Sequence, residues 1–291
     1  MKSDEITLHR GLQGVYFDRS ATTFIDGKKG VLEYRGYNIH DLAEHSTFEE
    51  TAYLLIYGNL PTKVQLHEFD SELKAARELP EKILDVIDLV KDSHPMDVLR
   101  TAVSALASFD SDRGDNSPEA TIHKGNRLTS QVPGIVMAHH AIRRGKDPIK
   151  PRATLSHAAN FLYMLEGNEP SADAASLMDK DFVLHADHGS NASAFTARTV
   201  AGTAADIHGA VTAGIAALSG PSHGGAAENV MHMAKEIGKP ENAADYVHNL
   251  LSSRQRVMGF GHRVYKAEDP RARHLREGVK NLSDEMGQSE W

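Results

Sequence analysis

The chain has 291 residues, of which 40% are hydrophobic and 25% are charged, and its formal net charge at pH 7 is −8. This length suits one large core with a smaller satellite, or two domains, and the composition is that of a soluble globular protein without an apolar window that could span a membrane. The absence of cysteine excludes disulfides, thiolate catalysis and cysteine-ligated metal centres. The acidic balance disfavours nucleic acid as a partner, and the acid-containing N-terminus is unlike a targeting signal, which predicts a cytoplasmic location.

The first predicted element is a small N-terminal β-meander. Strand-favouring runs (GVYFDR, ATTFI and VLEYR) occupy the segment from Gly14 to Arg35. They are separated by Ser20 and by Asp26-Gly27, a dipeptide typical of a hairpin turn.

Helices are predicted from Asn38 onward, because apolar residues recur there every three or four positions. Thr47 is a candidate N-cap, and the sequence SHPMD around Pro95 reads as a helix start. The segment from Asp110 to Ser117 (DSDRGDNS) is predicted to be an exposed loop. Prolines punctuate the chain at helix-length intervals, which predicts a series of helices between them: Pro61, Pro80, Pro95, Pro118, Pro133, Pro148, Pro151 and Pro170.

Small side chains fill most positions from Ser193 to Leu218. Because small residues let helices approach closely, we expect a tightly packed helix or helix pair here. An ordinary alanine-rich core helix and a subunit interface are equally compatible with this pattern.

Three histidine-bearing segments are flanked by glycine or other small residues: LHADHGSNAS (184–193), GPSHGG (220–225) and MGFGHRVY (258–265). One histidine among seventeen is weak evidence by itself, but glycine on both sides permits a tight backbone around the imidazole. A neutral imidazole donates through one nitrogen and accepts through the other. His223 and His262 are therefore the catalytic candidates, and together they would activate two carbonyl substrates.

A metal site is not predicted. His185 and His188 have HxxH spacing, but Ala186 and Asp187 between them supply neither the usual glutamate nor a third ligand.

Basic residues crowd the segment around His262, where the acids are Glu268 and Asp269. A solvated basic helix face is one explanation. A local site for phosphate and carboxylate groups is the other, since arginine near a glycine-rich turn often holds such anions. The basic residues are Arg254, Arg256, Arg263, Lys266, Arg271, Arg273 and Arg276.

These motifs, together with EYRGYNIHDLA (33–43), SHPMDVLRTAVSAL (93–106) and KAEDPRA (266–272), resemble the citrate synthase family in its short bacterial and archaeal form, which includes 2-methylcitrate synthases. The resemblance runs to about residue 276. It implies a mainly α-helical, citrate synthase-like multi-helical fold with a small N-terminal β-meander. It also implies a large helical domain over residues 1–222, a small CoA-binding domain over residues 223–291 that closes as a lid, and a homodimer.

The resemblance further implies condensation of acetyl-CoA with oxaloacetate and water to citrate and CoA. On this basis His223 stabilises the acetyl-CoA enolate, His262 polarises the oxaloacetate ketone, and His188 and Arg271 bind the oxo acid. No tightly bound cofactor is expected, because acetyl-CoA and CoA are substrate and product, and the partners are small molecules rather than nucleic acid or membrane. The residues expected to contact CoA are Arg256, Val257, Met258, Gly259 and Phe260.

The general base of the family is an aspartate in a PNVD-like motif that the resemblance places beyond Trp291, and Asp284 in NLSDEMGQ does not match it. We therefore expect either a chain that lacks the C-terminal part of the family or a naturally short homologue with defective catalysis. Without a positioned base the 291 residues would condense acetyl-CoA very slowly. The alternatives are a 2-methylcitrate synthase that uses propionyl-CoA and a non-catalytic protein that binds CoA esters.

Overall fold

The structure is a computed structural model, and it describes residue 15, residues 19–262 and residues 264–287. It is mainly α-helical with one small sheet, as predicted. No helix within these residues is long and apolar enough to cross a bilayer.

The sheet is antiparallel and has three short strands, β1 (Thr23–Asp26), β2 (Val31–Tyr34) and β3 (Tyr37–Asn38). β1 and β2 form the predicted hairpin, in which Asp26 lies opposite Val31. The Asp26 carboxylate closes the turn by accepting hydrogen bonds from the Lys28 and Lys29 amides. In the earlier GVYFDR run (14–19), residues 14 and 16–18 lie outside the described residues, and the third strand of the sheet follows the hairpin.

A bundle of ten helices makes up most of the described chain, and several of its caps agree with the sequence. Thr47 forms a capping box with Glu50 at the start of the second helix, and the fifth helix begins at Pro95 as predicted. The helices are α1 (Ile39–His45), α2 (Phe48–Tyr57), α3 (Lys63–Ala75), α4 (Glu81–Leu89), α5 (Pro95–Leu106), α6 (Pro118–Ile142), α7 (His157–Glu166), α8 (Ala172–His185), α9 (Ala192–Ala201) and α10 (Ile207–Leu218), with a 3-10 turn at Ala107–Phe109.

Pro133 does not separate two helices, so that prediction is wrong. It lies inside α6, a single helix of 25 residues. A proline removes one helical hydrogen bond, but α6 runs through the main core, where Leu128, Ile135 and Ala138 pack against α4, α5 and α10. Burial on both sides of the proline outweighs the lost bond.

The segment of small side chains from Ser193 to Leu218 forms a helix pair, α9 and α10. A helix pair was one of the two predictions for this segment. An added Cβ atom at Gly214 would lie 3.4 Å from the Ser193 carbonyl oxygen and 3.5 Å from the Ala197 Cβ atom. Glycine and alanine therefore set how closely the two helices approach.

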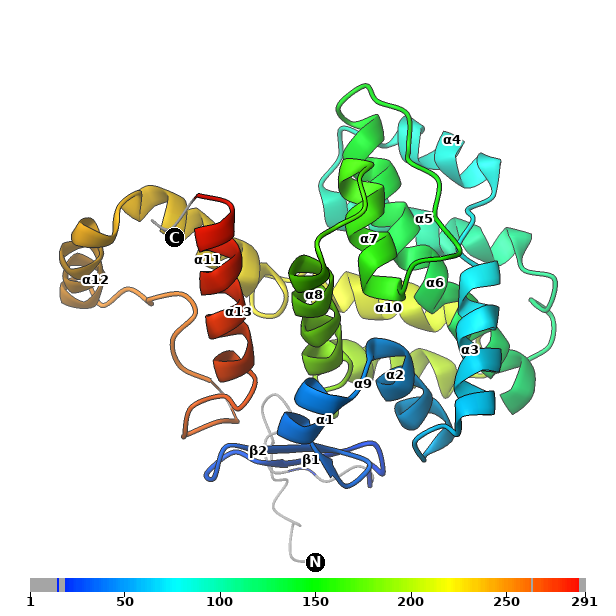
Figure 1. Cartoon of the computed structure of the whole chain (residues 1–291), viewed down its shortest axis with the longest axis horizontal. Helices are drawn as coiled ribbons and strands as arrows, with labels where there is room; N and C mark the ends of the chain where they lie inside the picture. The colour runs from blue at the N-terminus through cyan, green and yellow to red at the C-terminus, as the bar shows by residue number, and fades with distance from the viewer. Residues whose placement is uncertain (1–14, 16–18, 263, 288–291) are drawn as a thin grey trace, which may run out of the picture.

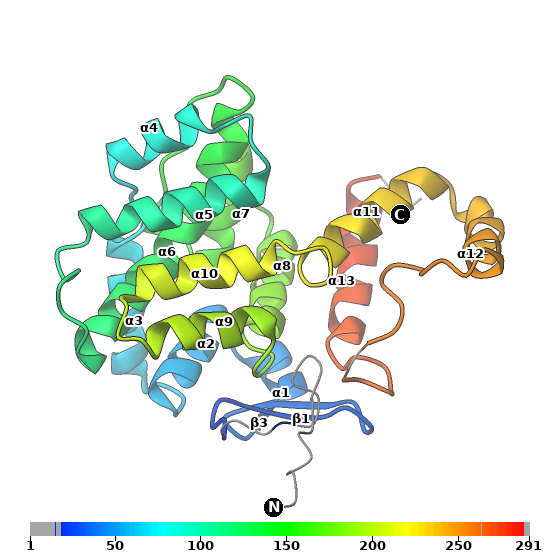
Figure 2. The same cartoon turned by 180° about the vertical axis from the view of Figure 1, so that it is seen from behind.

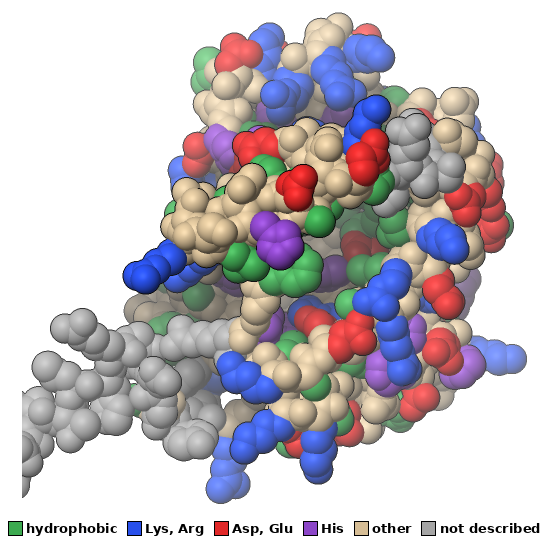
Figure 3. Space-filling model, turned by 90° about the vertical axis from the view of Figure 1, so that its left-hand side faces the viewer, with side chains coloured by type: hydrophobic (Ala, Val, Ile, Leu, Met, Phe, Trp, Pro, Cys, Tyr) green, Lys and Arg blue, Asp and Glu red, His purple; other side chains and the backbone are tan. Residues whose placement is uncertain are grey.

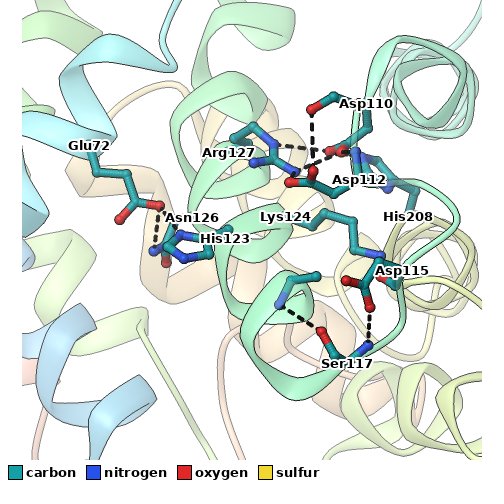
Figure 4. A network of polar contacts seen from close by, with 12 residues as sticks. Glu72, Asp110, Asp112, Asp115, Ser117, His123, Lys124, Asn126, Arg127 and His208 are labelled. Atoms are coloured by element: carbon teal, nitrogen blue, oxygen red, sulfur yellow. Dashed lines mark hydrogen bonds and ion pairs between the residues drawn. The ribbon is translucent and has the colours of Figure 1, made fainter.

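The loop from Asp110 to Ser117 is largely exposed, as predicted, but it is anchored by buried charges (Figure 4). The Asp110 side chain is 4% exposed and forms a bidentate ion pair with Arg127, at 2.7 and 3.0 Å. The ammonium group of buried Lys124 donates to the Asp115 carbonyl oxygen. His208, 2% exposed, lies 3.6 Å from Asp110 and ties α10 to this network.

The remaining helices form a lobe that stands apart from the bundle in both views (Figures 1 and 2). α11 leads away from the end of α10, and α13 returns to lie beside α8. Leu275 of α13 packs on the second core cluster, which contains Leu32, Leu42 and Leu184. The helices of this lobe are α11 (Gly225–Ile237), α12 (Ala243–Ser252) and α13 (Ala272–Glu285), with a 3-10 turn at Pro240–Asn242.

Candidate active site

His223 lies in a tight turn between α10 and α11. Its amide donates to the Gly220 carbonyl oxygen, and the Gly224 amide donates to the Leu218 carbonyl oxygen, both at 2.9 Å. An added Cβ atom at Gly224 would lie 2.6 Å from the Leu218 oxygen. Glycine is therefore required beside His223 because the backbone passes too closely for a side chain.

The His223 ring is oriented by the N-terminal end of α9. Its Nε2 atom lies 2.9 Å from the Ser193 hydroxyl, which also lies 2.7 Å from the Asn191 side-chain oxygen. Asn191 is itself the N-cap of α9. In the structure the serine hydroxyl donates its one proton to the Asn191 side-chain oxygen, and a hydroxyl turned toward His223 donates that proton to Nε2 instead. When it donates to Nε2 of a neutral His223, the ring proton is on Nδ1.

The proton position of a neutral His262 is set by the backbone. Its Nδ1 atom accepts hydrogen bonds from the amides of Val264 and Tyr265, at 3.1 and 3.0 Å. An acceptor nitrogen in a neutral imidazole has no proton, so the proton is on Nε2. His262 therefore offers an N–H donor on the side of the ring opposite to its own backbone loop.

His188 lies against His262 and Tyr265. The His188 and His262 rings are 5.7 Å apart and nearly perpendicular, and the Tyr265 hydroxyl lies 3.1 Å from His188 Nε2. Burial, reinforced by the nearby Arg271 guanidinium, lowers the pKa of His188 to about 4. His188 is therefore neutral at physiological pH.

Arg271 is half-buried and has a partner that the sequence did not assign. Asp269 accepts from Arg271 Nε at 2.9 Å and from Nη2 at 2.7 Å. Burial by itself would raise the pKa of the Asp269 carboxyl, but the bonds from Arg271 hold it below its usual value. Since Asp269 occupies one edge of the guanidinium, the Nη1 group is the donor open to a further anion.

The predicted CoA-contacting segment is an irregular loop between α12 and the His262 turn. Arg256, Gly259 and Phe260 are exposed, and Phe260 retains 77% of its surface. Val257 and Met258 are half-buried. Gly259 has φ 81° and lies against Val230 of α11, so the loop requires glycine at that position.

Two of the basic residues around His262 are engaged by neighbouring acids. Figure 3 views the side on which α11–α13 lie, where basic and acidic side chains are interspersed around a hollow that has histidine on its rim. The two acids of this segment are both paired, since Glu268 accepts from Arg276 at 2.6 Å and Asp269 binds Arg271. Arg263 lies outside the described residues.

His185 does not join His188 in a shared site. Its Nδ1 atom lies 2.9 Å from the Asp181 carbonyl oxygen, and the hydrogen bond to the Asp181 side chain raises its pKa. Among the residues that the structure describes, no group of three or more His, Asp or Glu side chains could hold a metal ion.

The structure thus brings His188, His262 and Arg271 together, and it places His223 in a second group with Ser193 and Asn191. The sequence motifs contained Ser193, Asn191 and Tyr265, but their local pattern gave no reason to assign them a role. Two rigidly held imidazoles beside an arginine suit an enzyme that activates carbonyl groups of an anionic substrate.

The chain belongs to the citrate synthase family, and it is a citrate synthase-type enzyme. The family profile described as "Citrate synthase, C-terminal domain" matches residues 11–291. Citrate synthase of Deinococcus radiodurans is 45% identical, over 97% of this chain and 75% of its own length. A 2-methylcitrate synthase of Mycobacterium tuberculosis is 39% identical, over 98% of this chain and 72% of its own length.

A solved structure of the family has the same fold. It is citrate synthase of Thermoplasma acidophilum in ternary complex with carboxymethyl coenzyme A and oxaloacetate. Its TM-score is 0.91 at 28% identity, and the match covers 97% of this chain and 74% of that one.

Proposed function

We propose that this protein takes part in the condensation of acetyl-CoA with oxaloacetate and water, which yields citrate and CoA. The observation that carries the proposal is the pair of imidazoles, His223 and His262, each held by hydrogen bonds that determine which nitrogen faces a substrate. The Thermoplasma relative was solved with oxaloacetate and a CoA analogue, which supports the same pair of ligands here.

His262 would act on the oxo acid. Its Nε2–H donates a hydrogen bond to the ketone oxygen and makes the carbonyl carbon more electrophilic. As the new carbon–carbon bond forms, this proton passes to the oxygen, which becomes the hydroxyl group of the citryl thioester. Water then cleaves the thioester and releases CoA.

His223 would act on the acyl-CoA. With Ser193 donating to Nε2, the Nδ1–H group donates to the thioester oxygen and stabilises the negative charge that develops when the α-carbon loses its proton. The proton passes to a general base other than His223 and His262.

His188 and Arg271 would bind the oxo acid. Neutral His188 offers one N–H donor, and the free edge of the Arg271 guanidinium suits a carboxylate. His188 lies beside His262 and close to the Arg271 guanidinium, so a small dicarboxylate can contact all three side chains.

The CoA ester would lie against the small lobe. We propose a large domain of residues 1–222 and a small CoA-binding domain of residues 223–291 that closes over the substrates and excludes water. Arg256, Val257, Met258, Gly259 and Phe260 are the proposed contacts, and the exposure of Phe260 and Arg256 leaves them accessible to a nucleotide. No tightly bound cofactor is part of this proposal.

Propionyl-CoA is the second candidate substrate, because a 2-methylcitrate synthase is among the relatives. One extra methyl group changes binding in a pocket by only about 1–3 kcal/mol, so neither the motifs nor the positions of the imidazoles separate the two acyl groups.

A homodimer in the cytoplasm is the proposed working form. No residue of α9 is fully buried, although the helix consists largely of Ala, Thr and other small side chains. A second subunit packed against the α9–α10 pair would cover this surface.

The test combines binding with turnover. Calorimetry should detect oxaloacetate binding to the wild-type protein, and His262→Ala should weaken it. CoA release should require both acetyl-CoA and oxaloacetate and should collapse in the same variant, and propionyl-CoA is tested in parallel. Oxaloacetate that fails to bind the folded wild-type protein would contradict the proposal. Binding of CoA esters without any CoA release would favour a non-catalytic function.

A further inference from the structure

Tyr265 contacts both of the imidazoles that face the oxo-acid site. Its hydroxyl lies 3.1 Å from His188 Nε2, and its amide donates to His262 Nδ1 at 3.0 Å. Its ring is 5.0 Å from the His262 ring and 5.5 Å from the His188 ring. Tyr265 thus contacts two candidate substrate-binding residues, His188 through its hydroxyl and His262 through its amide.

The direction of the bond to His188 follows from chemistry. A phenol is a good donor, and the lone pair of a neutral imidazole nitrogen is a good acceptor. Burial keeps both groups uncharged, because it raises the pKa of Tyr265 to about 12 and lowers that of His188 to about 4. A hydroxyl that donates to Nε2 puts the His188 ring proton on Nδ1.

Tyr265 is itself held by the N-terminal sheet. Tyr265 is 4% exposed, and the next residue, Lys266, donates its amide to the Gly27 carbonyl oxygen at 2.7 Å. An added Cβ atom at Gly27 would overlap the Val264 carbonyl group. The turn between β1 and β2 therefore anchors the loop that carries Tyr265.

We propose that Tyr265 is a positioning residue whose hydroxyl fixes the proton of His188 on Nδ1, while its amide, together with that of Val264, keeps the proton of His262 on Nε2, so that both rings present an N–H donor to an anionic oxo acid. This inference rests on the proposed function for the identity of the ligand. The proton positions themselves are a property of the unliganded protein.

The decisive variant is Tyr265→Phe, which keeps the ring and the amide and removes only the hydroxyl. In the protein labelled with nitrogen-15 at histidine, imidazole NMR should show the Nδ1–H form for His188 and the Nε2–H form for His262. In the variant, His188 should become a mixture of the Nδ1–H and Nε2–H tautomers, while His262 should keep the Nε2–H tautomer. Tyr37→Phe is the matched control, because Tyr37 is 41% exposed.

The binding consequence follows from the lost hydrogen bond. Tyr265→Phe should weaken the binding of oxaloacetate roughly tenfold, and Tyr37→Phe should leave the affinity for oxaloacetate unchanged. The inference would be overturned if the His188 proton of the wild type is on Nε2. It would also be overturned if Tyr265→Phe has the same imidazole tautomers and the same affinity for oxaloacetate as the wild type. If the variant does not fold, the wild-type spectrum still decides. Failure of the wild type to bind oxaloacetate would count against the proposed function, since the NMR measurement needs no substrate.

Discussion

His40 of α1 and His274 of α13 lie in hydrogen-bond contact, with 2.7 Å between Nδ1 of the first and Nε2 of the second. The two residues are 234 positions apart in the chain. This bond joins the α11–α13 lobe to the helix that follows the N-terminal sheet. A histidine pair of this kind shares one proton, because one ring donates and the other accepts.

The contact should weaken in mild acid. Burial, followed by the charge of Arg273, lowers the pKa of His40, and burial, followed by His40, lowers that of His274. Lys180 acts in the same direction on His274, whereas Glu44 raises the pKa of both and Asp41 that of His40. Since both folded-state values lie below the ordinary 6.5, the stabilising contribution is complete above pH 6.5 and is lost as the pH falls below it.

Hydrogen exchange of α13 measures this loss. Protection of the α13 amides, corrected for intrinsic rates, should fall between about pH 7.5 and about pH 5.5 in the wild type. His40→Ala should reduce protection at the higher pH and weaken the dependence of protection on pH. His45→Ala, an exposed histidine on the same helix, should behave as the wild type. If His40→Ala shows the same pH dependence as the wild type, the loss of α13 protection in acid comes from other groups.

Gly27→Ala tests the anchor beneath the His262 loop. A methyl group there meets the Val264 carbonyl carbon and oxygen, so the loop must shift and the hydrogen bond from Lys266 should break. We expect a loss of about 1–3 kcal/mol in the free energy of unfolding and weaker oxaloacetate binding. Gly114→Ala is the control, because nothing lies within 4 Å of its added Cβ atom. Wild-type stability and affinity in Gly27→Ala would refute the anchoring role.

Local signals in the sequence were sufficient for much of the fold. The Asp26-Gly27 turn, the Thr47 capping box and the helix start at Pro95 are decided by residues within a few positions of one another. Pro133 was misjudged because a local rule for proline competes with burial of the whole of α6, which depends on helices distant in the sequence.

The candidate site divides in the same way. The glycine residues around His223 and His262 are a local signal that predicts tight turns, and the structure has tight turns at both positions. Ser193 is 30 residues from His223, and Tyr265 is 77 residues from His188. Such pairs form only when the chain folds, so a single sequence contains no local signal for them.

Arg127→Met tests the buried network of Figure 4. The substitution leaves the Asp110 carboxylate, 4% exposed, without its bidentate partner. Removing one member of a buried ion pair typically costs about 3–5 kcal/mol, which urea unfolding would measure. Arg100→Met breaks a pair with Asp97 whose side chains are 39% and 47% exposed, so it should cost less than about 1 kcal/mol. Equal costs for the two variants would mean that burial of Asp110 has no energetic consequence.

Ser193→Ala tests how His223 is oriented. Without the hydroxyl, His223 Nε2 loses its partner at 2.9 Å, and the ring is free to adopt the form that cannot donate from Nδ1. The rate of CoA release should fall roughly tenfold to a hundredfold, while the KM for oxaloacetate stays the same because His188 and Arg271 are untouched. Ser193→Thr, which retains a hydroxyl, should recover most of the rate, and Thr196→Ala on the same helix should match the wild type. Imidazole NMR of His223 provides a readout that needs no turnover, and an unchanged spectrum in Ser193→Ala would show that the serine does not determine its proton position.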